Sequence, residues 1–280
     1  MRKRGFIQNA LILTASSLIL RTAGTFFGVY LSGKIGAAGM GLFQLIFTAY
    51  MLFATFATSG ISLAVTRIVS ESTAMGVPET GVAAVRRCLL FCVSYGLLAM
   101  TALYLLSDFI AARWLLDERA ALPLKILSPS LPCLAVASCL RGYFIAVGKV
   151  EKSMASDFLE NFVYIGLVML FVDSALPKGL AFSCSVLMGA STSADILSVL
   201  FSLHLYRKEK KLYKTISPPK GIGKKVLRIS LPIAAGSYVR SGLATIENML
   251  IPRGLTRYEG SSEAALARYG LVKGMVLPVL

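Results

Sequence analysis

Charged side chains are scarce in this sequence. Only 15% of its 280 residues are Asp, Glu, Lys or Arg, whereas 56% are hydrophobic, and the mean hydropathy is +0.71. A soluble domain carries about 25% charged residues, so this chain lacks the polar side chains needed to cover a water-exposed surface. Disorder is excluded for the same reason. The composition predicts a polytopic membrane protein.

Residues that bind metals or form disulfides are also few. The five cysteines lie inside apolar stretches without any Cys-x-x-Cys pair, and His204 is the only histidine. This excludes a disulfide framework and a metal or haem site. No Ser-His-Asp set and no phosphate-binding glycine loop after a strand is present. The sequence therefore predicts neither an enzyme nor a cofactor.

Long apolar runs are abundant in this sequence and indicate where it crosses the membrane. Stretches of about 20 apolar residues are read as membrane-spanning helices, which predicts an all-α fold with seven complete spans and an eighth that begins near Ala264. The seven spans are Phe6–Leu31, Gly41–Thr66, Cys88–Ser107, Leu122–Val147, Ala155–Val172, Gly179–His204 and Ile229–Ile251.

The longest polar stretch divides the chain. Residues 206–228 are basic and contain Pro218 and Pro219, so they are predicted to be a linker between a six-span lobe, 1–205, and the start of a second lobe, 229–280. Parallel six-span repeats are common in transporters.

The basic residues predict an orientation. On this topology 18 Lys and Arg lie on the side of the N-terminus and 8 on the other, so the N-terminus and the linker should face the cytoplasm. There they would contact anionic phospholipids, which accounts for the net charge of +15. Nucleic acid is not predicted as a partner, because no recognition motif is present.

A weak internal repeat supports the two-lobe interpretation. Arg21 and Arg240 each lie near the middle of the first span of their lobe and are followed by small residues. Gly41 and Gly270 then begin the second spans, 20 and 30 residues after the arginines. We therefore expect a second bundle of about six spans, of which these 280 residues hold the first one and a half.

Arg21 is the most informative ionisable residue, because a charge within a span is costly and usually faces a cavity or a partner. It shares a stripe of small and polar residues with Thr14, Ser17, Thr25 and Gly28. Such a stripe forms either a packing seam between helices or the wall of a water-filled cavity. A seam would not require an arginine, so the cavity is favoured.

Four further candidates for substrate binding accompany Arg240. Glu247 and Asn248 lie two turns further along the same span, and Lys273 lies in the eighth. Asp195, near the middle of the sixth span, would either pair with an arginine, carry a coupling proton or be hydrogen-bonded as part of the packing. For Glu247, neutralisation by neighbouring helices is as plausible as a role in a site.

Near the start of the fifth span, Asp157, Glu160 and Asn161 share a face. Acidic residues favour the first turn of a helix, so a structural role is preferred for them over a functional one.

Five stretches in order along the chain resemble the flippases of polysaccharides and lipid-linked oligosaccharides, and within these the stage V sporulation protein B group, which is related to lipid II flippases. The stretches are Gly36–Gln44, Ser59–Glu71, Leu140–Phe144, Ile246–Leu255 and Tyr269–Pro278.

This resemblance implies two six-span lobes around a central cavity, in which arginines hold the pyrophosphate of a polyprenyl carrier. Arg21 matches the first-span arginine of the pattern. Two positions depart from it: Tyr164 stands where a basic residue is expected, and Glu247 where an aspartate is usual. The first departure puts one contact with the substrate in doubt.

The leading hypothesis is therefore a flippase that moves a lipid-linked oligosaccharide or cell-wall precursor across the cell membrane by alternating access. One alternative is an antiporter for organic cations of the multidrug and toxin extrusion type. Another is a membrane scaffold that recruits envelope-synthesis enzymes through the basic linker.

Overall fold

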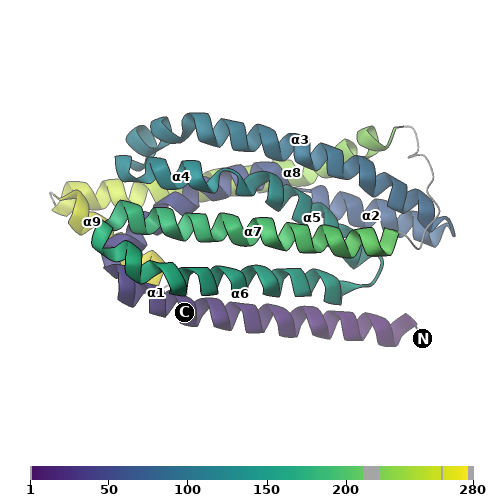
Figure 1. The fold of residues 1–280 in the computed structure, drawn as a ribbon. Coiled ribbons are helices and arrows are strands. Elements are labelled where there is room, and N and C mark those ends of the chain that lie inside the picture. Colours follow the sequence, from purple (N-terminus) through teal and green to yellow (C-terminus); the bar gives the residue numbers. More distant parts are fainter. Residues whose placement is uncertain (1, 211–220, 260, 277–280) are drawn as a thin grey trace.

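The computed structural model describes residues 2–210, 221–259 and 261–276, which form a bundle of long helices (Figure 1). Across these residues the secondary structure is helix and turn, with no strand. Helices are expected here because the backbone of an apolar span finds no water and must bond to itself.

Helix α1, Arg2–Thr58, contains the first predicted span and most of the second. At Gly36 the backbone leaves the helical region (φ 71°, ψ 177°), and the chain turns back along the bundle (Figure 1). A second break at Gly60, with φ 74°, precedes α2, Ile61–Ala74. The predicted span Gly41–Thr66 therefore follows the turn at Gly36 and is interrupted at Gly60. Both positions are glycines, which tolerate positive φ.

The other helices of the first predicted lobe follow α2 along the chain. They are α3, Pro78–Phe109; the π-helical turn η1, Ile110–Leu115; the short η2, Glu118–Ala120; α4, Ala121–Leu127; α5, Ser130–Ala146; α6, Val150–Ala175; η3, Leu176–Lys178; and α7, Leu180–Lys210. α4 and α5 together correspond to the predicted fourth span, bent by 45° at their junction. The buried residues of α4 and α5 belong to an apolar core that also contains buried residues of α1 and α2. Tyr143 and Phe144 are among the largest side chains in this core.

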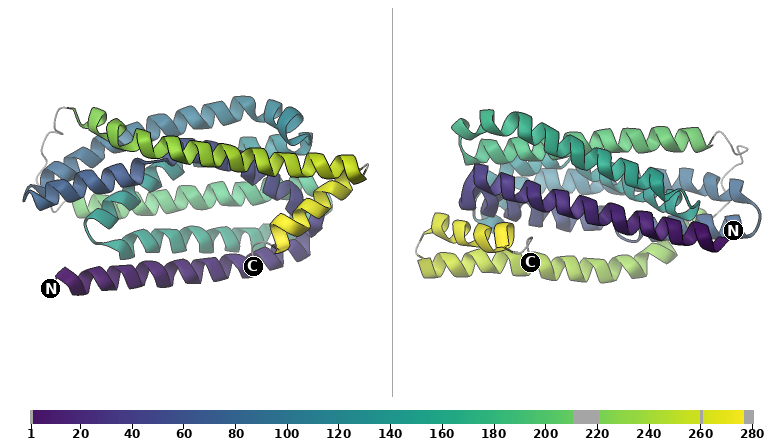
Figure 2. Two further views of the ribbon diagram at one scale, coloured as in Figure 1. Left: turned by 180° about the vertical axis from the view of Figure 1, so that it is seen from behind. Right: turned by 90° about the horizontal axis from the view of Figure 1, so that it is seen from below.

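Helix α8, Ile222–Glu259, starts beside α2 and runs the length of the bundle (Figure 2). After it, α9, Ser262–Tyr269, and η4, Gly270–Val276, turn back against α1. Gly270 lies so close to α1 that a Cβ there would stand 2.0 Å from the carbonyl oxygen of Ala37 and 2.5 Å from the nitrogen of Gly41. The two glycines that the predicted repeat pairs, Gly41 and Gly270, thus lie in contact.

By length and apolar composition alone, four helical stretches among the described residues can each cross a membrane, and the bent pair α4–α5 makes a fifth. The first of them, Asn9–Ala74, has 66 residues, more than twice the length of about 20 residues that one span needs, and its backbone leaves the helical region at Gly36. α8 does not pass this test, so the count of seven spans and part of an eighth stays a prediction. The predicted linker begins as the last turn of α7 and ends as the first turns of α8; residues 211–220 between them lie outside the described residues.

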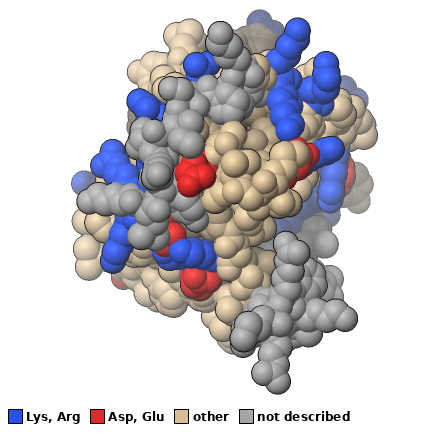
Figure 3. Space-filling model, turned by 90° about the vertical axis from the view of Figure 1, so that its right-hand side faces the viewer, with Lys and Arg blue, Asp and Glu red and all other residues tan. Residues whose placement is uncertain are grey.

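One end of the bundle gathers many of the lysines and arginines (Figure 3). We call it the basic end; it comprises the α2–α3 turn, the α5–α6 turn, the end of α7 and the start of α8. Several of its cations have carboxylate partners. Arg141 pairs with Asp157 at 2.5 Å, and Lys149 and Lys152 both contact the buried carboxylate of Glu209.

Candidate functional site

Arg21 lies on an exposed face of α1. The hydroxyls of Thr14, Ser17 and Thr25 on the same stripe each donate to the carbonyl four residues earlier in α1. Their hydrogen-bonding needs are met within the helix, and Thr14, Ser17 and Arg21 are exposed. In the described part of the chain this portion of the stripe therefore does not form a packing seam, and no acidic residue pairs with the Arg21 guanidinium there.

Arg240 has the same setting on α8. It is exposed, and among the described residues it has no acidic partner. α1 and α8 both start at the basic end, and where α1 contacts α8 it does so beyond its turn at Gly36, at Phe56 and Tyr238. At a rise of 1.5 Å per residue, Arg21 lies about 28 Å from the start of α1 and Arg240 about 27 Å from the start of α8. The two arginines therefore stand at similar depths on helices that run in the same direction.

Glu247 and Asn248 lie about two turns beyond Arg240 on α8, and Lys273 on η4 reaches Glu247. The Lys273 ammonium lies 3.3 Å from a Glu247 carboxylate oxygen, so η4 is tied to α8. The side-chain oxygen of Asn248 is buried and has no hydrogen-bond partner among the described residues. The charge of Lys273, a predicted substrate-binding residue, is therefore balanced by Glu247.

Asp195 belongs to a different cavity. It is 8% exposed and lines a space of about 210 Å³ between α1, α6 and α7, together with Glu160, Asn161 and Tyr164. The Ser130 hydroxyl lies 2.6 Å from the Tyr50 hydroxyl and donates to the carbonyl of Leu127. Neither Asp195 nor Glu160 pairs with a cation in the described chain. Of the three interpretations of Asp195, pairing with an arginine is therefore not observed.

Sequence reasoning assigned Glu160 a structural role at a helix start, yet it shares this cavity with Asp195. The sequence could not show this shared cavity, because no sequence pattern indicates that α6 packs against α7. Glu160 and Tyr164 are one helical turn apart, and this spacing alone could have indicated a common face.

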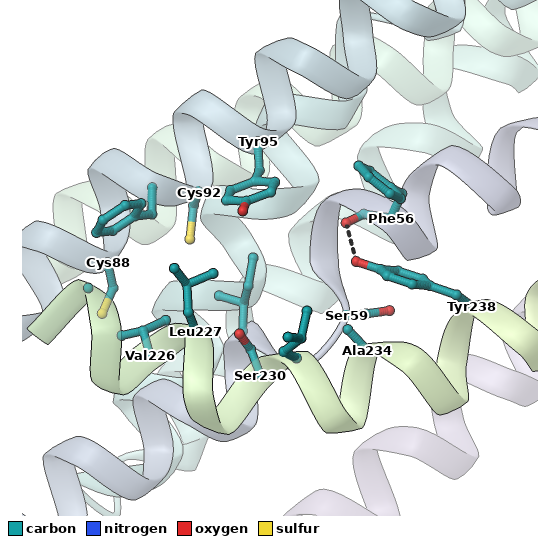
Figure 4. A pocket seen from close by; sticks show the side chains of 14 residues that line it. Phe56, Ser59, Cys88, Cys92, Tyr95, Val226, Leu227, Ser230, Ala234 and Tyr238 are labelled. Carbon is teal, nitrogen blue, oxygen red and sulfur yellow. Dashed lines mark hydrogen bonds between the residues drawn. The ribbon is translucent and has the colours of Figure 1, made fainter.

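A second cavity lies where α8 meets the end of α1 and the middle of α3 (Figure 4). Its wall is mainly apolar and includes the thiols of Cys88 and Cys92. The Tyr238 hydroxyl donates to the carbonyl of Phe56 at 3.4 Å, and the two rings stack with centroids 5.2 Å apart. This crevice is an interface between the first predicted lobe and α8.

Residues 6–275 match the family described as polysaccharide biosynthesis proteins. The chain belongs to this family. The resemblance inferred from the sequence is confirmed, and the chain is a multi-pass protein of the cell membrane.

Three relatives from Bacillus subtilis (strain 168) match most or all of this chain. Stage V sporulation protein B is 26% identical over 290 residues, covering 100% of this chain and 55% of the relative. Lipid II flippase MurJ is 24% identical over 254 residues, covering 85% and 46%. Sporulation protein YkvU is 19% identical, covering 98% and 61%. The chain therefore spans about half the length of these curated relatives.

One solved structure shares the fold. It is described as the inward-facing conformation of a multidrug resistance MATE family transporter of the MOP superfamily. It matches with a TM-score of 0.65 and 15% identity, over 92% of this chain and 60% of that chain. The names of these relatives and this neighbour are those of two sporulation proteins, one flippase and one transporter.

Proposed function

We infer that the protein is a flippase that carries a polyprenyl-pyrophosphate-linked sugar across the cell membrane by alternating access, with the basic end facing the cytoplasm. The observation that carries this inference is the pair of exposed arginines, Arg21 and Arg240, which have no acidic partner among the described residues and stand at similar depths on helices that both start at the basic end. Family membership over residues 6–275 supports it.

The chemistry of the two side chains suits this substrate. A pyrophosphate carries about two negative charges across a layer of low dielectric constant, where an unpaired charge is costly. A guanidinium binds two phosphate oxygens at once and stays protonated. Arg21 and Arg240 come from the two predicted lobes, and sites in repeat-built transporters form between such lobes near the bilayer midplane. Relative rocking of the lobes would then pass the headgroup across while the prenyl chain stays in the lipid.

Binding of a fluorescent polyprenyl-pyrophosphate sugar to the protein in nanodiscs tests this function. Arg21→Ala and Arg240→Ala should each raise the dissociation constant at least about tenfold, because a lost hydrogen bond between charged groups is worth about 1.5–3 kcal/mol. Arg87→Ala is the matched control, since Arg87 is an exposed arginine on α3 at the basic end. Unchanged binding in both variants would contradict the flippase and favour a scaffold.

The second candidate is an antiporter of organic cations. It is favoured by the cavity that holds Asp195 and Glu160, two carboxylates without a cationic partner in the described chain. Such carboxylates would bind a cationic substrate or a coupling ion. If Asp195→Asn abolished the binding of an organic cation while Arg21→Ala and Arg240→Ala left all binding unchanged, the antiporter would be supported and the flippase overturned.

A further inference from the structure

A basic cleft opens at the basic end, between α2 and the start of α8. Its volume is about 720 Å³, within the range of about 300–1,000 Å³ that is usual for small-molecule sites. We call it the α2–α8 cleft. Its wall consists of Arg67, Gly221, Lys224, Lys225, Arg228, Ile229, Pro232 and Ile233.

The charge of this cleft is unbalanced. Glu71 holds two of its cations, with a carboxylate oxygen 3.0 Å from Arg67 Nε and another 2.6 Å from Lys225 Nζ. Lys224 and Arg228 are exposed and have no acidic partner among the described residues. Four cations therefore face one carboxylate, an excess that matches an anion with more than one negative charge.

Glu71 also gives the cleft a fixed shape. Because it bridges α2 and α8, it holds Arg67 and Lys225 on opposite walls. Lys224 and Arg228 are four residues apart and so lie one above the other on α8. These two free cations are thus presented side by side next to the fixed pair.

The inner wall of the cleft is apolar. Ile229, Pro232 and Ile233 follow the cations along α8 toward the middle of the bundle. Ile229, Ile233 and Arg240 recur on one face of α8 at steps of four and seven residues. Arg240 lies about 18 Å beyond Arg228 by helical rise. The cleft therefore combines an anion site with an apolar track that leads toward the arginine of the proposed transport path.

We propose that the α2–α8 cleft is the receiving site for the pyrophosphate of a lipid-linked substrate, before it reaches Arg240. The excess cations bind the pyrophosphate at the membrane surface, and the apolar wall contacts the first units of the prenyl chain. This inference rests on the proposed function. It adds a second, shallower site, distinct from the pair Arg21 and Arg240, that captures substrate from the leaflet at the basic end.

Binding of fluorescent polyprenyl pyrophosphate to the full chain in phosphatidylcholine nanodiscs tests the cleft. The variant K224Q/R228Q removes its two free cations. The control R207Q/K208Q removes the same charge from exposed residues at the end of α7, on the same end of the bundle. K224R/R228K keeps both charges and shows whether a loss comes from charge or from folding.

The cleft variant should raise the dissociation constant at least about tenfold, whereas the control and the charge-keeping variant should stay within about twofold. Inorganic pyrophosphate should compete only weakly, because it lacks the chain, and phosphatidylglycerol should compete weakly because it carries a single charge. Equal competition by either probe would overturn the assignment to a lipid-linked pyrophosphate.

The outcomes separate this inference from the proposed function. If K224Q/R228Q binds as wild type does while Arg240→Ala does not, the cleft assignment is wrong and the flippase stands. If the cleft and control variants lose affinity equally, the effect is general surface charge, and the cleft assignment is again wrong. If the wild-type protein does not bind the probe at all, both inferences fail.

Discussion

Gly270→Ala tests the contact between the two repeat-related glycines. An added Cβ would stand 2.0 Å from the carbonyl oxygen of Ala37 and 2.5 Å from the nitrogen of Gly41. Non-bonded heavy atoms prefer separations of about 3.5–4.0 Å. The opposing atoms are backbone, so no side chain can rotate away. η4 and α1 must instead move apart by more than about 1 Å.

Overpacking of this kind costs about 1–3 kcal/mol. In a chain of this size 1 kcal/mol shifts the melting temperature by about 2–4 °C, so thermal unfolding of the purified protein should begin about 2–12 °C lower. Gly166→Ala is the matched control, because nothing lies within 4 Å of the Cβ that it would add. On α6 it should stabilise by about 0.5–1 kcal/mol through helix propensity. The reasoning is refuted if Gly270→Ala melts at or above the wild-type temperature.

Two further substitutions address buried charge. Glu209→Gln should lower the melting temperature by an amount equivalent to about 1–2 kcal/mol, because two lysines lose a carboxylate that is only 7% exposed; Asp173→Asn, whose pair with Lys34 is exposed, is the control and should leave melting unchanged. Asp195→Asn should melt no lower than wild type, since it removes a buried carboxylate that lacks a cationic partner and lies close to Glu160; a clear loss of stability, measured by the same unfolding assay, would show that the charge is needed for folding.

The positions of the breaks in the second and fourth predicted spans were not predictable from apolar runs. Hydropathy shows where a chain can be buried in lipid, but Gly60 breaks its helix where α8 passes. A Cβ at Gly60 would stand 2.6 Å from the carbonyl oxygen of Ser230. That contact joins residues 170 positions apart in the sequence. Only the packed structure shows why a glycine is needed there.

The candidate site divides in the same way. Arg21 and Arg240 could be chosen from the sequence because a charge in an apolar run is costly wherever the helix packs. The pairing of Lys273 with Glu247, the cavity shared by Asp195 and Glu160, and the α2–α8 cleft depend on which helices are neighbours. Arg67 could not be assigned to this cleft from the sequence, because its sequence neighbours do not reveal the lysines that α8 brings opposite it.

The sequence by itself determined that this is a membrane protein. Its shortage of charge and its long apolar runs require a membrane, and a membrane requires helices whose backbones bond internally. It also determined the family, through short stretches kept in order along the chain. The tertiary structure decided which side chains share a space, because helices are placed by side-chain packing between residues far apart in the sequence. That packing joins Gly41 to Gly270 and Glu71 to Lys225, and it leaves Arg21 and Arg240 exposed.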